Sequence, residues 1–132
     1  MSNMFNNGRS GELIALLLKA VEHTDDAVLI TDQKGRIQYV NPAFERVTQF
    51  SRHEAIGKTP RLLKSGMHSD KQYRDLWSTI LSGKVHRHTV ANRKKNGMIY
   101  YSDQTITPVC DNTGFITNFI SVAKDMTAFL TV

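Results

Sequence analysis

The dipeptide Asn96-Gly97 restricts the fold of this chain more than any other feature of its sequence. It lies between two long runs of strand-favouring residues, 85–95 and 98–109, and Asn-Gly in such a place is the strongest short-range signal for a β-hairpin. A second turn signal, Asp111-Asn112-Thr113-Gly114, leads into a third run at 115–124. The C-terminal part of the chain is therefore predicted to form three consecutive antiparallel strands.

The register of the first hairpin decides which side chains share a face of the sheet. A two-residue loop, Asn96-Gly97, places Asn92 opposite Tyr101, whereas a three-residue loop that includes Met98 places Asn92 opposite Ser102. Because side chains alternate between the faces, a shift of one residue moves a whole set of side chains to the other side. The sequence leaves both registers open.

A shorter pair of strands is predicted earlier in the chain. Residues 27–31 (Ala-Val-Leu-Ile-Thr) have high strand propensity, and the turn signal at 32–35 (Asp-Gln-Lys-Gly) leads to a second strand at 36–40. The pattern then becomes helical, since Asn41 is a good N-cap and Pro42 suits the first position of a helix. We predict a short helix that ends between Val47 and Gln49.

Two further helices are predicted from capping boxes, a Ser followed three residues later by Glu or Gln. Ser51 and Glu54 begin a short helix that ends near Gly57, and Ser69 and Gln72 begin a longer one. Gly83 ends the longer helix, and its apolar residues have the i, i+3, i+4, i+7 spacing of an amphipathic helix: Tyr73, Leu76, Trp77 and Ile80.

The order of these elements predicts an α+β fold, with one five-stranded antiparallel sheet and short helices packed on one face. The chain has 132 residues, of which 40% are hydrophobic, the size of a single domain with one core. We place that core domain at 25–127 and expect 58–68 to be irregular. Trp77 is interpreted as an anchor of its helix in the core.

The N-terminal part is predicted to be a flexible lead-in at 1–10, rich in Asn, Ser and Gly, followed by a capping helix at 11–24. Apolar residues cover most of the surface of this helix, which is more than one small domain usually hides. Two interpretations stay open: the helix packs on its own sheet, or its remaining face contacts a second subunit. Residues 128–132 are expected to begin a linker.

Composition and motifs exclude several classes of function. The net charge is +5, but the densest basic run, Arg93-Lys94-Lys95, adjoins the hairpin turn, so we expect a solvated loop and no direct nucleic-acid contact. The single cysteine, Cys110, fits a reducing, cytoplasmic location. The longest apolar run, Leu13 to Leu18, is too short to insert across a membrane. No catalytic motif is found, so an enzyme is the least favoured class.

A curved sheet roofed by short helices favours a ligand pocket between the two layers. Candidate ligand-binding residues are Asn92, Ser102 and His88 from the strands, and Arg61, Asn41 and Trp77 from the helical part.

Histidines are the other candidates for chemistry. His86 and His88 share one strand face because side chains alternate, but a metal site needs a third ligand that the sequence does not name. His68 is a second conceivable haem ligand. We therefore predict no metal site.

Several stretches of the sequence resemble the PAS family, over roughly residues 15–127. The resemblance is carried in order by Ala27–Asp32, Gly35–Phe44 (with Tyr-Val-Asn-Pro-Ala-Phe), Gly57-Lys58, Asn92–Gly97, Thr107-Pro108-Val109 and Asp125-Met126-Thr127. It implies a sensory or dimerisation module of a larger signalling protein, such as a histidine kinase, cyclase, chemoreceptor or transcriptional regulator.

Within the family, the chain is most similar to the flavin-binding branch that includes the light-sensing LOV domains. The resemblance implies that Arg61 contacts a flavin phosphate and Asn92 the flavin ring. The photoactive cysteine position is Pro60, and the further ring-binding Asn and Gln positions are Ser102 and Ala123. FAD or FMN therefore stays open as the cofactor, without LOV adduct chemistry, and haem is not favoured.

The function predicted from the resemblance is a sensory module that binds a small ligand or responds to redox state. It would signal through its termini to an effector domain of the same chain, as a homodimer formed through the N-terminal helix. The alternative is a ligand-free scaffold used for dimerisation or protein interaction.

Overall fold

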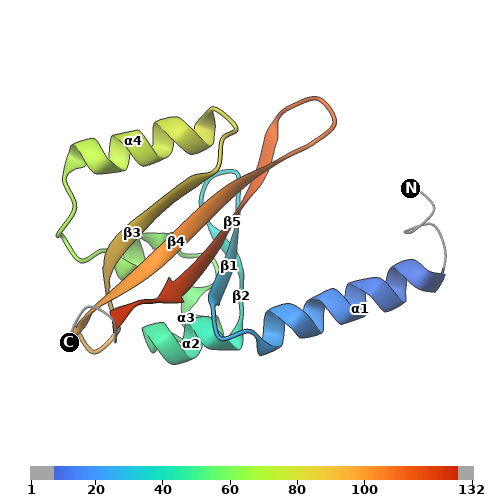
Figure 1. Ribbon diagram of the computed structural model, residues 1–132, viewed down its shortest axis with the longest axis horizontal. Helices are drawn as coiled ribbons and strands as arrows, with labels where there is room; N and C mark the ends of the chain where they lie inside the picture. The colour runs from blue at the N-terminus through green and yellow to red at the C-terminus, as the bar shows by residue number, and fades with distance from the viewer. Residues whose placement is uncertain (1–7, 128–132) are drawn as a thin grey trace.

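The computed structural model describes residues 8–127, which form one five-stranded antiparallel sheet with strand order β2-β1-β5-β4-β3. The strands are β1 (Ala27–Asp32), β2 (Ile37–Val40), β3 (His86–Arg93), β4 (Ile99–Cys110) and β5 (Ile116–Asp125). The predicted α+β class and the two pairs of hairpin strands are confirmed (Figure 1). Residues 128–132, the predicted start of a linker, lie outside the described part, as do 1–7.

Four helical segments follow β2 and cover one face of the sheet. They are α2 (Pro42–Thr48), α3 (Arg52–Ala55), the 3-10 helix η2 (Pro60–Leu63) and α4 (Asp70–Leu81). Two alternate residues of β1 show that α2 and α4 lie on the same face of the sheet. Leu29 lies next to residues of α2, and both Leu29 and Thr31 lie beneath α4. The segment 58–68 is thus not wholly irregular, because Pro60 fixes a backbone suited to the first turn of η2.

Both capping boxes form as predicted. The Ser51 N–H donates to Glu54 Oε1 (3.0 Å), and the Ser51 hydroxyl accepts from the Glu54 N–H (3.1 Å). Ser69 and Gln72 make the same pair of bonds at 2.7 and 3.1 Å. Each box satisfies N–H groups that a helix start leaves without partners, so local sequence fixes where α3 and α4 begin.

Asn41 joins three parts of the fold. Its Oδ1 accepts from the Phe44 N–H (3.0 Å), the predicted N-cap bond, and from the Val28 N–H of β1 (2.8 Å). Its Nδ2 donates to the carbonyl oxygens of Val21 and Asp26, both at 2.9 Å. The side chain is fully buried and all four of its hydrogen-bonding positions are used.

The hairpin between β3 and β4 has neither of the two predicted registers. Asn92 pairs with Tyr100, and Ser102 pairs with Val90. The loop is 95–97, because the Lys94 N–H bonds to the Met98 carbonyl and Gly97 adopts a positive φ of 92°.

Contacts outside the hairpin account for this register. The Lys95 N–H donates to the Thr48 carbonyl of α2, its ammonium pairs with Glu54 of α3, and the Asn96 N–H donates to Gln49. Lys95 therefore belongs to the loop and not to the strand.

The N-terminal helix, α1 (Gly8–His23), begins three residues before the predicted boundary, so residues 8–10 are helical and do not belong to a flexible lead-in. No proline interrupts the chain there, so the helix continues. It projects away from the sheet, and its last turn lies beside α2 (Figure 1). Four of its apolar side chains are each more than half exposed: Ile14, Leu16, Leu17 and Leu18. The interpretation that α1 packs on its own sheet is wrong for this face.

The core lies between the sheet and α2–α3, with Phe44, Ile37 and Val40 almost fully buried. Trp77 of α4 is not in it. Its side chain is 43% exposed, and its ring meets Phe119 of β5 edge to face at 6.1 Å. The core-anchor interpretation of Trp77 is wrong, because α4 stands off the sheet and buries only Ile80 fully.

We predict that Asn41→Ala lowers the free energy of unfolding by about 3 kcal/mol or more, because several buried backbone groups lose their partner at ~1–3 kcal/mol each. Urea unfolding measures the loss. Ser69→Ala, which removes an exposed cap, serves as the control and costs about 1 kcal/mol. Equal losses in the two variants would contradict the central place of Asn41.

Candidate functional site

A cleft of about 1250 Å³ separates α4 and η2 from the inner face of the sheet. Its lining comes from α4, η2 and the segment after η2 on one side, and from strands β1, β3, β4 and β5 on the other. Leu76, Trp77 and Ile80 form the helical wall, and Leu29, Ile106 and Phe119 are apolar residues of the sheet floor. An apolar cleft with a few polar groups is the usual form of a small-molecule site.

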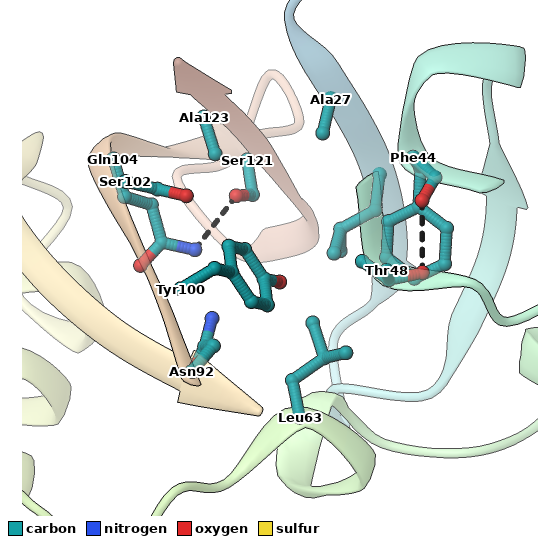
Figure 2. A pocket seen from close by; sticks show the side chains of 11 residues that line it. Ala27, Phe44, Thr48, Leu63, Asn92, Tyr100, Ser102, Gln104, Ser121 and Ala123 are labelled. Carbon is teal, nitrogen blue, oxygen red and sulfur yellow. Dashed lines mark hydrogen bonds between the residues drawn. The ribbon is translucent and has the colours of Figure 1, made fainter. Parts of the chain in front are cut away.

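The floor of the cleft also carries polar side chains from several strands. Asn92 and His88 come from β3, Gln104 from β4, Ser121 from β5 and Thr31 from β1. Alternation along each strand puts these residues on the same face. Gln104 Nε2 donates to Ser121 Oγ at 2.9 Å, which links β4 and β5 across the floor (Figure 2).

His88 is neutral at physiological pH. The pKa of its imidazole is lowered from 6.5 to about 4, mainly by burial and also by the nearby imidazoles of His86 and His68, while the charge of Asp103 opposes the shift. Its Nδ1 is buried and has no hydrogen-bond partner among the described residues. A buried polar atom without a partner is uncommon in native proteins, and ordered water or a ligand usually explains it.

Cations lie along the open side of the cleft. Arg61 of η2 and Lys64 just after it line one part, and Lys34 and Arg74 line others. The Lys64 ammonium lies 5.0 Å from the centroid of the Tyr73 ring. Asp70 and Asp75 are also among the lining residues, so the rim carries both signs, with the cations in excess.

A small void of about 20 Å³ adjoins the cleft, between α2 and the sheet (Figure 2). Five residues line both spaces: Leu29, Leu63, Asn92, Gln104 and Ser121. Ser102, Ala123 and Ala27 line it together with Phe44 and Tyr100. This volume is about that of one water molecule, so Ser102 faces a space that no larger ligand can enter. Burial raises the pKa of Tyr100 to about 12, so its hydroxyl keeps its proton.

The six predicted site residues therefore separate into two groups. Asn92, His88, Arg61 and Trp77 all line the cleft. Ser102 lines only the small void, and Asn41 is fully used by backbone groups. Gln104 and Ser121 were missed, although strand alternation two residues beyond Ser102 points to Gln104.

His68, another histidine that lines the cleft, bonds to the edge strand β3. Its Nε2 accepts from the Ala91 N–H of β3 at 2.9 Å, while the Ser65 hydroxyl donates to the Ala91 carbonyl at 2.6 Å. Only an unprotonated ring nitrogen accepts a hydrogen bond. His68 is thus engaged with the edge of the sheet, and within 8–127 no cluster of three His, Cys, Asp or Glu residues is placed to hold a metal ion.

We predict that His88 makes folding sensitive to acid. Its pKa is lower in the folded state, so the unfolded chain takes up a proton first as the pH falls, and stability is lost between about 6.5 and 4. The titration of His88 followed by NMR should have a midpoint near 4. His88→Gln should lose less stability than the wild type over this range. A midpoint near 6.5 would contradict the buried, neutral state.

Comparison with known proteins agrees with this architecture. Residues 15–126 match the PAS fold family. The nitrogen fixation regulatory proteins of Klebsiella oxytoca and Klebsiella pneumoniae are each 31% identical to the chain over 117 residues, which is 89% of this chain and 24% of theirs. A blue-light photoreceptor of Listeria innocua is 27% identical over 85% of this chain and 45% of its own. The chain thus spans about a quarter of the length of the regulatory proteins.

Solved structures share the same fold. An RNA-binding light-oxygen-voltage receptor superposes with a TM-score of 0.83 at 23% identity, over 92% of this chain and 34% of the receptor. A PAS domain from Colwellia psychrerythraea superposes with a TM-score of 0.74 at 21% identity, over 88% of this chain and 98% of that one. Histidine kinases of Dictyostelium discoideum and Brucella canis are also similar to the chain, at 28% identity each over 84% and 93% of its length. Because the family match covers residues 15–126, the chain belongs to the PAS fold family, as a sensory module of the kind found in such regulators and kinases.

Proposed function

We propose that this chain is the non-catalytic sensory module of a larger, cytoplasmic signalling protein, and that the cleft beneath α4 binds a planar aromatic ligand with an anionic tail. The observation that carries the proposal is the cleft itself, with its apolar walls, polar floor and cationic rim. Its volume of about 1250 Å³ exceeds the ~300–1000 Å³ usual for drug-sized ligands. A nucleotide-sized molecule therefore fits.

Flavin nucleotides are the first ligand class that these residues suit. Asn92 and Gln104 offer amides to the ring, Trp77 and Phe119 offer aromatic surface, and Arg61 offers a guanidinium to a phosphate. A bound flavin would supply redox or light sensitivity. A thiol adduct to it is ruled out here, because the chain's single cysteine, Cys110, is exposed at the end of β4 and does not line the cleft.

A signal from the cleft has two routes to neighbouring domains. At one end, Asn41 connects β1 to the last turn of α1. At the other, the Thr127 hydroxyl accepts from the Tyr101 N–H at 3.0 Å, which ties the chain after β5 to β4. Movement of the sheet would therefore reach both ends of the domain.

No helix within residues 8–127 has the length and apolar character needed to cross a bilayer.

We also propose that α1 forms a homodimer. Ile14, Leu17 and Leu18 are exposed at i, i+3 and i+4 and therefore share one side of a helix that projects from the domain, and Leu16 is exposed on another side. Exposed apolar patches of this kind mark interaction sites in soluble proteins. A second copy of the chain is the simplest partner, because each copy offers the same surface to the other.

The ligand proposal predicts that freshly purified protein, or protein incubated with FMN or FAD, shows flavin absorption bands and melts at a higher temperature than the untreated chain, since a ligand of the native state stabilises it. Arg61→Ala should weaken FMN binding by about tenfold, through the loss of one charge-assisted contact. Arg46→Ala, which removes an exposed cation outside the cleft, is the control. A colourless protein whose melting temperature no flavin changes would favour the scaffold function instead.

The dimer proposal predicts that the whole chain has twice its monomer mass in solution, and that Leu17→Glu converts it to a monomer by placing a charge in an apolar interface. Light scattering coupled to gel filtration measures both masses. Lys19→Glu also places a glutamate on α1 and should leave the dimer intact. A wild-type chain that stays monomeric at high concentration would refute this interface.

A further inference from the structure

The sheet has two edge strands, β2 and β3, and the β2 edge is closed by other parts of the chain. The Ile37 N–H donates to the Lys58 carbonyl, and the Ile37 carbonyl accepts from the Gly57 N–H, both at 2.8 Å. Arg52 Nε donates to the Val40 carbonyl at 3.2 Å. Because an uncovered edge is a template for another strand, these bonds prevent strand addition on the β2 side.

The β3 edge is covered at its C-terminal end by the segment 64–68. The Ala91 N–H donates to His68 Nε2 at 2.9 Å, and the Ala91 carbonyl accepts from the Ser65 hydroxyl at 2.6 Å. Lys64 and Asn92 form an isolated antiparallel bridge beside them. The segment 64–68 therefore occupies this edge from Ala91 onward.

The ladder with β4 shows which backbone groups of β3 point outward. The Lys94 N–H bonds to the Met98 carbonyl across the hairpin, so Lys94 and every second residue before it face β4. Ala91, which bonds to the segment 64–68, belongs to the outward set, and so do Thr89 and Arg87. No hydrogen bond from elsewhere in residues 8–127 reaches the backbone of Thr89 or Arg87. Their N–H and C=O groups are therefore available to another strand.

This part of β3, residues 87–89, is called the open edge below. The side chains of Arg87 and Thr89 are exposed, and Thr89 is among the residues that line the cleft beneath α4. Val85, which directly precedes β3, and Leu81, at the end of α4, are 56% and 59% exposed. An added strand would therefore find backbone partners together with apolar side chains that the domain itself leaves uncovered.

The charge of β3 and its flanks restricts the partner. Residues 84–95 contain no acidic residue and five cationic ones: Lys84, Arg87, Arg93, Lys94 and Lys95. Asp103 of β4 pairs with Arg87, and Glu54 of α3 pairs with Lys95, so the stretch stays positive overall. Like charges on paired strands are destabilising, and basic residues on an edge oppose pairing with a second copy. A strand with acidic side chains would instead be attracted.

We propose that the open edge of β3 binds an extended acidic segment of a partner protein, which adds to the sheet as a further strand beside Arg87 and Thr89. In such strand addition, main-chain hydrogen bonds supply the affinity and side chains supply the selectivity. The inference goes beyond the ligand proposed for the cleft and does not depend on it. Because few backbone groups are available, the contact should be weak and reversible.

The test measures the fluorescence anisotropy of a labelled peptide of alternating Glu and Val, about eight residues long to match a strand, with the whole chain. This peptide should bind, and added salt should weaken it because exposed charges are screened. A peptide with Lys in place of Glu tests charge, and one with Pro in place of Val keeps the charge but cannot pair as a strand. Neither control peptide should bind.

Two variants of the chain test the edge itself. Thr89→Pro removes an outward N–H group that the fold does not use, and edge strands tolerate proline. It should weaken the acidic peptide by about tenfold, for one lost hydrogen bond. Lys84→Glu leaves the backbone intact and should weaken the peptide by about threefold, so it serves if Thr89→Pro melts well below the wild type. Lys19→Glu makes the same charge change on α1 and is the control.

Amide hydrogen exchange followed by NMR gives a readout that does not depend on affinity. The Thr89 amide should exchange rapidly in the free chain and slowly with the acidic peptide, whereas the bonded Ala91 amide should be protected in both. A Thr89 amide that the bound peptide leaves unprotected would contradict strand addition.

The remaining outcomes also decide the proposal. Equal binding of the Pro-containing peptide, or no binding of the acidic one, overturns it. Single-stranded DNA that binds more tightly than the acidic peptide, and is weakened by Lys84→Glu but not by Thr89→Pro, would make the strand a general polyanion site and overturn the peptide assignment. None of these results bears on whether the cleft binds a flavin.

Discussion

The four hydrogen bonds of Asn41 are the interaction on which the rest of the structure depends. They fix the start of α2, the edge of β1 and the end of α1 at one buried point. Asn41 follows β2 directly and bonds to both β1 and α1. The position of β1, which forms part of the cleft floor, and the position of α1 therefore depend on the same side chain. An amide suits this place, since it alone offers two donors and two acceptor sites without a charge to bury.

The cleft follows from a difference between the helices. α2 and α3 pack tightly, with Phe44 and Ala55 buried, and they also fix the β3–β4 hairpin through Lys95. α4 stands off the sheet and buries only Ile80 fully, so a large space remains beneath it. The same sheet therefore has a closely packed half, which gives stability, and an open half, which is available for a ligand.

The two halves are connected through the strands and through η2, whose Leu63 belongs to the packed core and also lines the cleft. Leu29 lies both in the packed core and on the cleft floor, and the backbone of its neighbour Val28 bonds to Asn41. A ligand that binds one arrangement of the floor better than another would bias this connection by its difference in affinity, typically ~1–3 kcal/mol. The exposed apolar face of α1 lies at the far end of the same path.

Local chemistry let the sequence by itself determine the order of elements, both capping boxes and the N-cap at Asn41, because those bonds join residues close in the chain. Alternation along the strand likewise predicted that His86 and His88 share a face, and both line the cleft. Tertiary contacts decided the rest. Lys95 bonds to α2 and α3, which shifts the hairpin register; α4 stands off the sheet, which leaves Trp77 in a cleft; and strand pairing brings His88, Gln104 and Ser121 together. These outcomes join residues far apart in the sequence, so no local pattern encodes them.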